Sequence, residues 1–155
     1  MCIVVVMVDD GPEQVPDERN TPENMAREGL LKADLEKAWN CKLYHLPMYY
    51  HVDFFAERDH TLVSWVEVKH RNCTSTQYPT VYMNRDRKFH HLTAHSYTAR
   101  SVFVVRWSDG VTRYIDVADV REEWLGVGGE KDRGGPGEHD VEPVFEIPID
   151  EMRVL

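Results

Sequence analysis

The run Leu62-Val63-Ser64-Trp65-Val66-Glu67-Val68-Lys69 is the most informative stretch of the 155-residue chain. Side chains alternate between the two faces of a strand, and both faces of this run are mainly apolar, which predicts a strand covered on both sides. Glu67 and Lys69 share one face, about 7 Å apart. Buried charges need a partner or a metal, so we expect functional residues rather than an exposed ion pair of little energy. One face consists of Leu62, Ser64, Val66 and Val68, and the other consists of Val63, Trp65, Glu67 and Lys69.

A second acid precedes this strand. Asp53 lies between Val52 and Phe54-Phe55, and a hairpin turn expected at 57–60 would bring Asp53 and Glu67 to the same end of the sheet. Two carboxylates on adjacent strands form a hard oxygen site suited to Mg²⁺ or Mn²⁺. Lys69 is then placed to orient or deprotonate a water and to stabilise developing negative charge. These groups are what phosphodiester hydrolysis requires.

The rest of the chain supplies helices and further strands. Thr21 is a suitable N-cap and Pro22 favours a first helical position, while Ser108-Asp109-Gly110 separates two strand patterns and predicts a tight hairpin. This order predicts an α/β (α+β) domain with a mixed sheet. We expect residues 1–21 to form an N-terminal strand or extended arm, 22–125 the core, and 126–155 a glycine-rich loop and acidic tail. The expected strands are 42–46, 49–55, 61–71, 101–107, 111–117 and an edge strand at 144–147, and the expected helices are 22–39, 80–97 and 118–125.

Composition and charge exclude several classes of protein. Apolar residues make up 42% and charged residues 29%, as in a soluble globular domain. The longest apolar run, Ile3 to Val8, is far shorter than the ~20 residues of a membrane span. Twenty-seven acids against 18 bases give a net charge of −9, which excludes a protein that coats nucleic acid but not an enzyme with a local basic patch.

The three cysteines leave one alternative open. With no secretory signal visible, an odd and small number of cysteines indicates free thiols and a cytoplasmic location. The spacings Cys41-x₃-His45 and His70-x₂-Cys73 are also compatible with a zinc site. Neither pair lies in a zinc knuckle, so free thiols are the favoured interpretation.

Asp53, a gap of thirteen residues and then Glu67-Val68-Lys69 resemble the PD-(D/E)XK nuclease superfamily. The resemblance extends over about residues 22–120. Within this range the chain is similar to small phage-type members of the superfamily. It implies the restriction-endonuclease-like fold, a mixed central β-sheet flanked by helices. It also implies that Asp53, Glu67 and the Val68 carbonyl bind Mg²⁺ or Mn²⁺ and that Lys69 acts on the attacking water. One departure is that Val52, and no proline, precedes Asp53.

The same resemblance implies further roles for residues on the helices. Glu28 is the match for a helix glutamate of the catalytic site, with Glu36 in reserve. Arg71, Arg87 and Lys88 would contact nucleic acid, with DNA expected. The expected function is a metal-dependent nuclease acting in the cytoplasm, of the host cell for a phage protein, as a homodimer or within a protein complex. The alternative is a non-catalytic module on the same fold that binds nucleic acid or protein.

Overall fold

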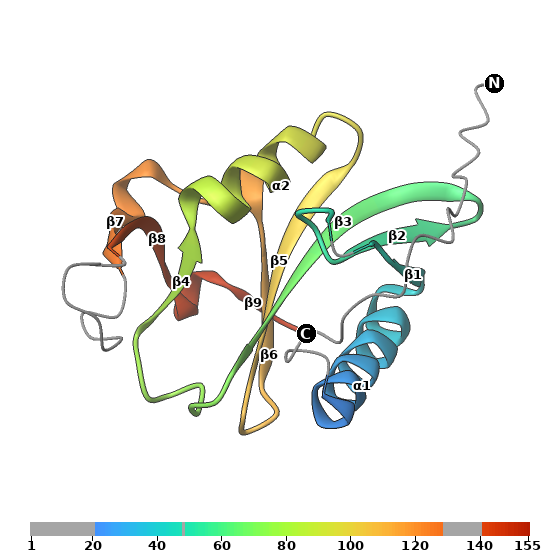
Figure 1. Ribbon diagram of the computed structural model, residues 1–155, viewed down its shortest axis with the longest axis horizontal. Helices are drawn as coiled ribbons and strands as arrows, with labels where there is room; N and C mark the ends of the chain where they lie inside the picture. Colours follow the sequence, from blue (N-terminus) through green and yellow to red (C-terminus); the bar gives the residue numbers. More distant parts are fainter. Residues whose placement is uncertain (1–20, 48, 129–140) are drawn as a thin grey trace.

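A six-stranded mixed sheet forms the centre of the protein in the computed structural model, which describes residues 21–47, 49–128 and 141–155. Its strands follow the order β1-β2-β3-β5-β6-β9, and a smaller sheet of order β4-β8-β7 lies beside it (Figure 1). The expected N-terminal arm up to residue 20 and most of the glycine-rich loop lie outside the described residues. The elements are α1 (Pro22–Trp39), β1 (Lys42–His45), β2 (Phe54–Arg58), β3 (Thr61–Arg71), β4 (Thr80–Asn84), a π-helical turn (Arg85–Phe89), α2 (His90–His95), β5 (Arg100–Trp107), β6 (Thr112–Asp116), β7 (Leu125–Gly128), β8 (Glu142–Pro148) and β9 (Arg153–Val154), with 3₁₀ turns at Val117–Asp119, Glu122–Trp124 and Ile149–Glu151.

The central strand β3 is covered on both sides, as its sequence predicts. It pairs antiparallel with β2 and parallel with β5, which makes the sheet mixed. On one side, Leu31 and Leu35 of α1 pack in a core with Val66. On the other side, Leu92 of α2 packs in a second core with Phe103. Figure 1 shows the two helices on opposite sides of β3, so the predicted mixed sheet flanked by helices is confirmed.

Helix α1 begins and ends where its sequence indicates. The Thr21 side chain accepts a hydrogen bond from the Asn24 backbone N–H at 3.2 Å, and Pro22 stands at the first helical position. Asn40 ends the helix in the left-handed conformation, with φ 48°. None of the helices among the described residues is long and apolar enough to cross a membrane.

The hairpin between β5 and β6 is also confirmed. The two strands pair antiparallel, and Gly110 has a φ of 82° in the turn. Glycine adopts this conformation without the steric cost that a Cβ brings. The hairpin holds β5 against β3 and therefore supports the strand that carries Glu67 and Lys69.

The helix expected over 80–97 is wrong in its first part. Residues 80–84 form β4, in which Val81 and Met83 are buried and paired with β8 while Tyr82 is exposed. This alternation has the two-residue period of a strand. The chain then enters the π-helical turn, whose start is stabilised by a 2.7 Å hydrogen bond from the Arg87 N–H to the Asn84 side chain, and only 90–95 is α-helical.

Two other boundaries differ from the predictions. The strand expected over 49–55 begins only at Phe54, because the chain first makes a turn in which the Tyr50 N–H donates to the Pro47 carbonyl at 2.8 Å. The following hairpin turns at Asp59 and His60, both with positive φ. The helix expected over 118–125 is replaced by the 3₁₀ turns at 117–119 and 122–124 and the start of β7.

Strand β8 lies at the centre of the smaller sheet and not at an edge. β8 pairs with β4 on one side and with β7 on the other. Val144, Phe145 and Ile147 are buried, and Phe145 and Ile147 belong to the core beneath α2. The expectation of an edge strand at 144–147 is therefore wrong. Its two partner strands, at 80–84 and 125–128, have sequences that indicate a helix and a loop, so pairing on both sides of β8 is not expected from the sequence.

Candidate active site

Asp53 lies just before β2 begins, beside a part of β3 that has no partner strand on this side. The register of the two strands starts at Phe54 opposite Val66, so β3 continues beyond the first residue of β2. The Asp53 carboxylate takes the place of the missing strand, accepting a hydrogen bond from the Val68 N–H at 2.8 Å. The Asp53 carbonyl accepts a second bond from the Leu46 N–H at 2.8 Å. The side chain of Asp53 is thus held by β3 and its backbone by the residue that follows β1.

Glu67 is a buried carboxylate, with only 4% of its surface exposed. Its Oε1 forms an ion pair with the Lys88 amine. Its Oε2 is buried and has no hydrogen-bond partner among the described residues. Burial, followed by the nearby negative charge of Asp53, raises the pKa of Glu67 to about 8, and burial also raises the pKa of Asp53. The two carboxylates therefore repel each other in a region from which water is largely excluded.

Lys69 is held beside this pair by a backbone contact. Its Nζ donates a hydrogen bond to the Tyr82 carbonyl at 2.7 Å, across to β4. Burial, followed by the positive charge of Arg71, lowers the pKa of Lys69 to about 8. A lysine with such a pKa is partly neutral near physiological pH, which is the condition for accepting a proton from water.

Glu28 reaches the rim of the site from α1. Its Oε1 lies 2.8 Å from Nε2 of His45, whose Nδ1 lies 2.9 Å from the Leu46 carbonyl. Because both ring nitrogens face acceptors, the charged imidazolium satisfies both contacts. Burial lowers the pKa of His45, but the bonds to Leu46 and Glu28 outweigh it, and the pKa is raised overall. The negative charge of Glu28 in turn contributes to the raised pKa of Asp53.

The structure brings together most of the residues singled out from the sequence. Lys88 contacts Glu67 directly, and Arg71 acts electrostatically on Lys69. The remaining basic residue, Arg87, pairs instead with Glu142 at the start of β8. The reserve helix acid, Glu36, is likewise engaged elsewhere, because its Oε2 accepts a hydrogen bond from the Leu43 N–H at 3.2 Å.

Two features of the site were missed in the sequence. His45 was considered only as a zinc ligand, although its place at the end of a predicted strand was a signal that it lies near Asp53. The Tyr82 carbonyl had no signal, since 80–84 was expected to be helical. The described residues contain no group of three or more His, Cys, Asp or Glu side chains arranged to hold a metal, and Cys41 and Cys73 are free thiols. The zinc alternative is therefore not supported.

The donors present fit a hard divalent cation that keeps much of its water. Asp53 and Glu67 supply two close carboxylates, and the Oε2 of Glu67 has no hydrogen-bond partner among the described residues. Mg²⁺ in proteins is commonly held by one or two carboxylates, with water and substrate phosphate completing its shell. A cage of three or more protein side chains is not required for such binding.

A protein-family model matches most of this chain, including both of its sheets. No curated protein matches it. Among solved structures, the Holliday junction resolvase Hjc of the archaeal hyperthermophile Archaeoglobus fulgidus is similar with a TM-score of 0.49 and 18% identity, over 70% of this chain and 80% of that chain. The family model described as "Phage putative PDDEXK endonuclease" matches residues 17–155, which include every strand of both sheets and each residue of the candidate site. The chain therefore belongs to this phage PDDEXK endonuclease family.

Proposed function

We propose that the protein is a metal-dependent nuclease that hydrolyses phosphodiester bonds, with DNA as the substrate. The observation that carries the proposal is the buried carboxylate pair of Asp53 and Glu67, in which Glu67 Oε2 has no partner among the described residues. A fold has no structural use for two repelling acids in its interior. Their presence in a member of an endonuclease family supports a cation-binding role.

Three oxygen donors would hold the cation. Asp53 and Glu67 would each contribute a carboxylate, and Val68 would contribute its carbonyl. In a strand the N–H and C=O of one residue point to the same side, and the Val68 N–H points to Asp53, which favours a Val68 carbonyl directed to the same edge. When bound, a divalent cation supplies polarisation of a phosphoryl oxygen and a bound water of lowered pKa.

Lys69 and Glu28 would act around this centre. Neutral Lys69 would accept a proton at Nζ from the attacking water, and protonated Lys69 would stabilise negative charge on the phosphoryl group. The Tyr82 carbonyl would orient the Lys69 amine throughout. Glu28, held by His45, would orient water at the rim of the site. Lys88 would neutralise Glu67 when no cation is bound.

Cleavage of labelled single-stranded, duplex, flapped and branched DNA with Mg²⁺, Mn²⁺ or EDTA tests this proposal. We expect metal-dependent cutting by the wild type, and a loss of about 10²-fold or more in Lys69→Ala and Asp53→Asn. Lys42→Gln, on the exposed outer strand β1, is the matched control and should cut like the wild type.

Metal binding provides a second measurement that does not depend on cutting. Calorimetric titration with Mn²⁺ should detect binding of the metal to the wild type and no binding to Asp53→Asn. Full activity in a folded Asp53→Asn protein would reject the assigned site. A wild type that neither cuts any substrate nor binds Mn²⁺ would instead favour the non-catalytic binding module.

A further inference from the structure

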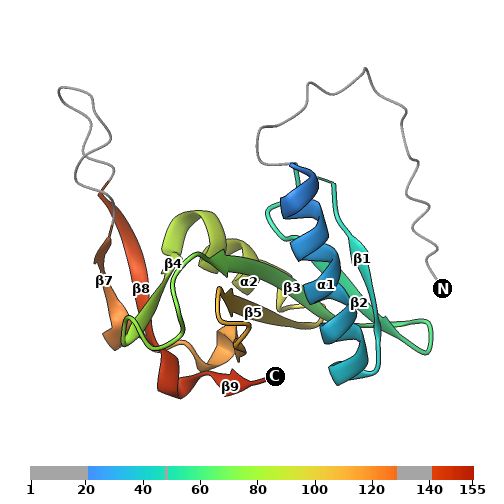
Figure 2. The ribbon, with the colours of Figure 1, turned by 90° about the horizontal axis from the view of Figure 1, so that it is seen from below.

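Three adjoining pockets run along one side of α1. The helix lies over the part of the sheet that contains β1, β2 and β3 (Figure 2), and at its end Trp39 contacts Tyr114 of β6. The first pocket, about 480 Å³, shares Arg106 and Gly110 with the second, about 560 Å³. The second shares Ala38 with the third, about 460 Å³. We call these three pockets together the α1 groove.

The first pocket begins next to the catalytic residues. It is lined by His70 and Arg71, which follow Lys69 on β3, and by Arg106 on β5. His70 and Arg106 are opposite each other in the parallel pair, so the pocket lies at the carboxyl ends of two parallel strands, where open sheets commonly bind ligands. Arg27 lines it from α1. His70 lies on the opposite face of β3 from Glu67 and Lys69, so the groove starts at the same end of the sheet as the candidate active site, but on the α1 side.

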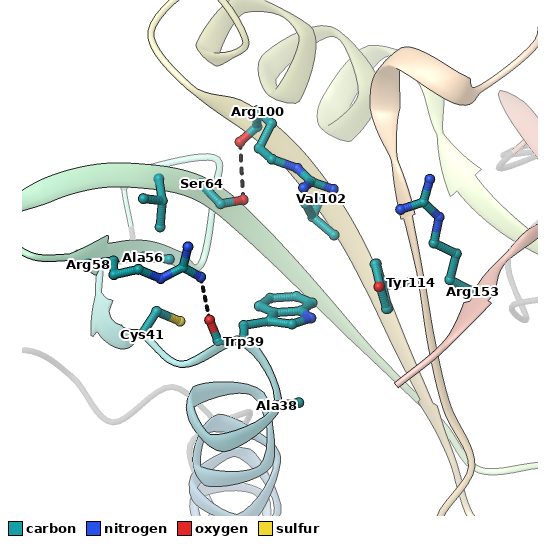
Figure 3. A pocket seen from close by; sticks show the side chains of 11 residues that line it. Ala38, Trp39, Cys41, Ala56, Arg58, Ser64, Arg100, Val102, Tyr114 and Arg153 are labelled. Carbon is teal, nitrogen blue, oxygen red and sulfur yellow. Dashed lines mark hydrogen bonds between the residues drawn. The ribbon is translucent and has the colours of Figure 1, made fainter.

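The third pocket, at the far end of the groove, combines arginines with aromatic rings (Figure 3). Arg58, Arg100 and Arg153 line it from β2, β5 and β9, together with Trp39 and Tyr114. Guanidinium groups bind phosphate, and flat rings stack on bases. This combination is typical of surfaces that hold a nucleic-acid strand.

Local structure accounts for some of these cations but not for all of them. Arg58 donates to the Asn40 carbonyl at 2.9 Å at the end of α1, and Arg100 pairs with Asp116 at 3.2 Å. Lys37 in the second pocket and Arg153 in the third form no ion pair with any described residue, and both are exposed. The charges of Lys37 and Arg153 are therefore available to a ligand.

The charge of the groove differs from that of the whole chain. The chain carries a net charge of −9, yet Asp34 is the only acidic side chain that lines any of the three pockets. Asp34 is itself paired with Arg106. Such a concentration of positive charge in an acidic protein is the electrostatic footprint expected for a polyanionic ligand.

We propose that the α1 groove binds the sugar–phosphate backbone of one nucleic-acid strand as it leaves the catalytic carboxylates; this rests on the proposed nuclease function of that site. The part of α1 that lines the groove runs from Arg27 to Trp39, which spans about 20 Å. At an axial rise of about 3.4 Å per phosphate, as in one strand of B-DNA, this length accommodates about six phosphates. Strands of only about four nucleotides would fill the end near Lys69 and leave Lys37 and Arg153 without a phosphate.

Metal-free binding measured by fluorescence anisotropy tests the groove independently of cutting. The probes are labelled single strands of about 4 and about 20 nucleotides and a duplex of about 20 base pairs. The groove variant is Lys37→Gln/Arg153→Gln. Its matched control is Lys42→Gln/Arg121→Gln, which removes the same charge from β1 and from the loop before the 3₁₀ turn at 122–124, outside the groove.

We expect the groove variant to bind the long single strand or the duplex about tenfold more weakly, with a salt dependence reduced by about one to two ions released. The control should stay within about twofold of the wild type, and the short strand should bind all three proteins alike. If the affinity for the long single strand falls more than that for the duplex, the groove binds single strands, and the reverse result identifies the duplex. Equal losses of affinity in the groove variant and in the control would overturn the proposal. It would also be overturned if sedimentation showed that the wild type self-associates and that only the groove variant does not, because the groove would then be a protein–protein interface.

The two proposals can fail separately. Weakened binding in the groove variant without cleavage by the wild type would support the groove and reject the nuclease. Metal-dependent cleavage with equal affinities in the two double variants would support the nuclease and reject the groove.

Discussion

At the scale of single residues, the candidate site is maintained against an electrostatic cost. Glu67 is buried beside Asp53, and only one of its two oxygens has a counter-charge, from Lys88. The protein interior disfavours ionised carboxylates, so the metal-free fold would be more stable without this acid. Active sites commonly reduce stability in this way, because function needs groups that the fold does not.

Replacing Glu67 with Gln should therefore stabilise the metal-free protein, in a pH-dependent manner. The pKa of Glu67 is about 8 in the folded protein, against 4.5 for an ordinary glutamate. The folded state retains the proton longer than the unfolded state, so the acid destabilises the fold increasingly as pH rises from about 4.5 to about 8. We expect the Tm of Glu67→Gln in EDTA to exceed that of the wild type by about 2–4 °C at pH 8, or about 1 kcal/mol, with little difference at pH 5. An unchanged or lower Tm at pH 8 would contradict the assignment of a strained carboxylate.

Lys88 should compete with a cation for Glu67. Its amine is paired with Oε1 of that residue, so its positive charge repels a cation that binds at Oε2, which has no hydrogen-bond partner among the described residues. Lys88→Ala should bind Mn²⁺ about tenfold more tightly, equivalent to about 1.4 kcal/mol, as measured by calorimetry. Arg85→Ala is the control, since Arg85 lies on the same π-helical turn but pairs with Asp86. Weaker Mn²⁺ binding in Lys88→Ala would show that the lysine helps to assemble the site and does not compete.

At the scale of elements, backbone conformation is what the sequence specifies best, and two glycines provide a matched comparison. A Cβ built on Gly110 or on Gly29 meets no atom within 4 Å, but only Gly110 has a positive φ. Gly110→Ala should lose about 1 kcal/mol of unfolding free energy because alanine is strained in the left-handed region. Gly29→Ala should gain about 0.5–1 kcal/mol because alanine favours the helix interior. Urea denaturation measures both, and equal effects of the two changes would contradict this account.

Elements whose determinants are local could be predicted from the sequence. The cap at Thr21, the Asp109-Gly110 turn and the doubly apolar alternation of β3 each depend on neighbouring residues, and all three are confirmed. The acid-x-lysine at 67–69 could be located for the same reason. β4 could not, because its five residues are strand only through pairing with β8, 60 to 68 positions later. The partners of Lys69 and Lys88 depend on β4 and on the turn after it, so the sequence indicated these residues but not their contacts.

At the scale of the whole molecule, the basic α1 groove contrasts with the acidic remainder of the chain. Long-range repulsion between a chain of charge −9 and nucleic acid slows encounter, whereas a local basic groove binds once contact is made. The acids Asp34 and Asp116 each pair with an arginine that lines the α1 groove and thereby limit its strength. Affinity for nucleic acid should therefore decline only moderately as salt is raised, because the slope is set by the few cations that are free.

The C-terminal segment completes the core, so its removal should unfold the protein. A chain that ends at Gly128 lacks β8, the only strand that pairs with β4 or β7 in the smaller sheet. It also loses the buried side chains of Val144, Phe145 and Ile147, each of which contributes about 1.5–3 kcal/mol when fully buried. Their sum is comparable to the whole stability of a typical domain, about 5–15 kcal/mol. We expect no cooperative urea transition by circular dichroism for this truncated chain.

A chain that ends at Met152 is the control for this truncation. It loses only β9 and Leu155, which packs at the edge of the core beneath α1 and donates one backbone hydrogen bond to the Thr112 carbonyl at 3.0 Å. Because β9 forms only two register pairs with β6, this shorter deletion should leave a cooperative transition, weakened by about 1–2 kcal/mol. A cooperative transition in the chain ending at Gly128 would show instead that residues up to 128 fold alone, and that β4 is held through its contacts with the π-helical turn and α2.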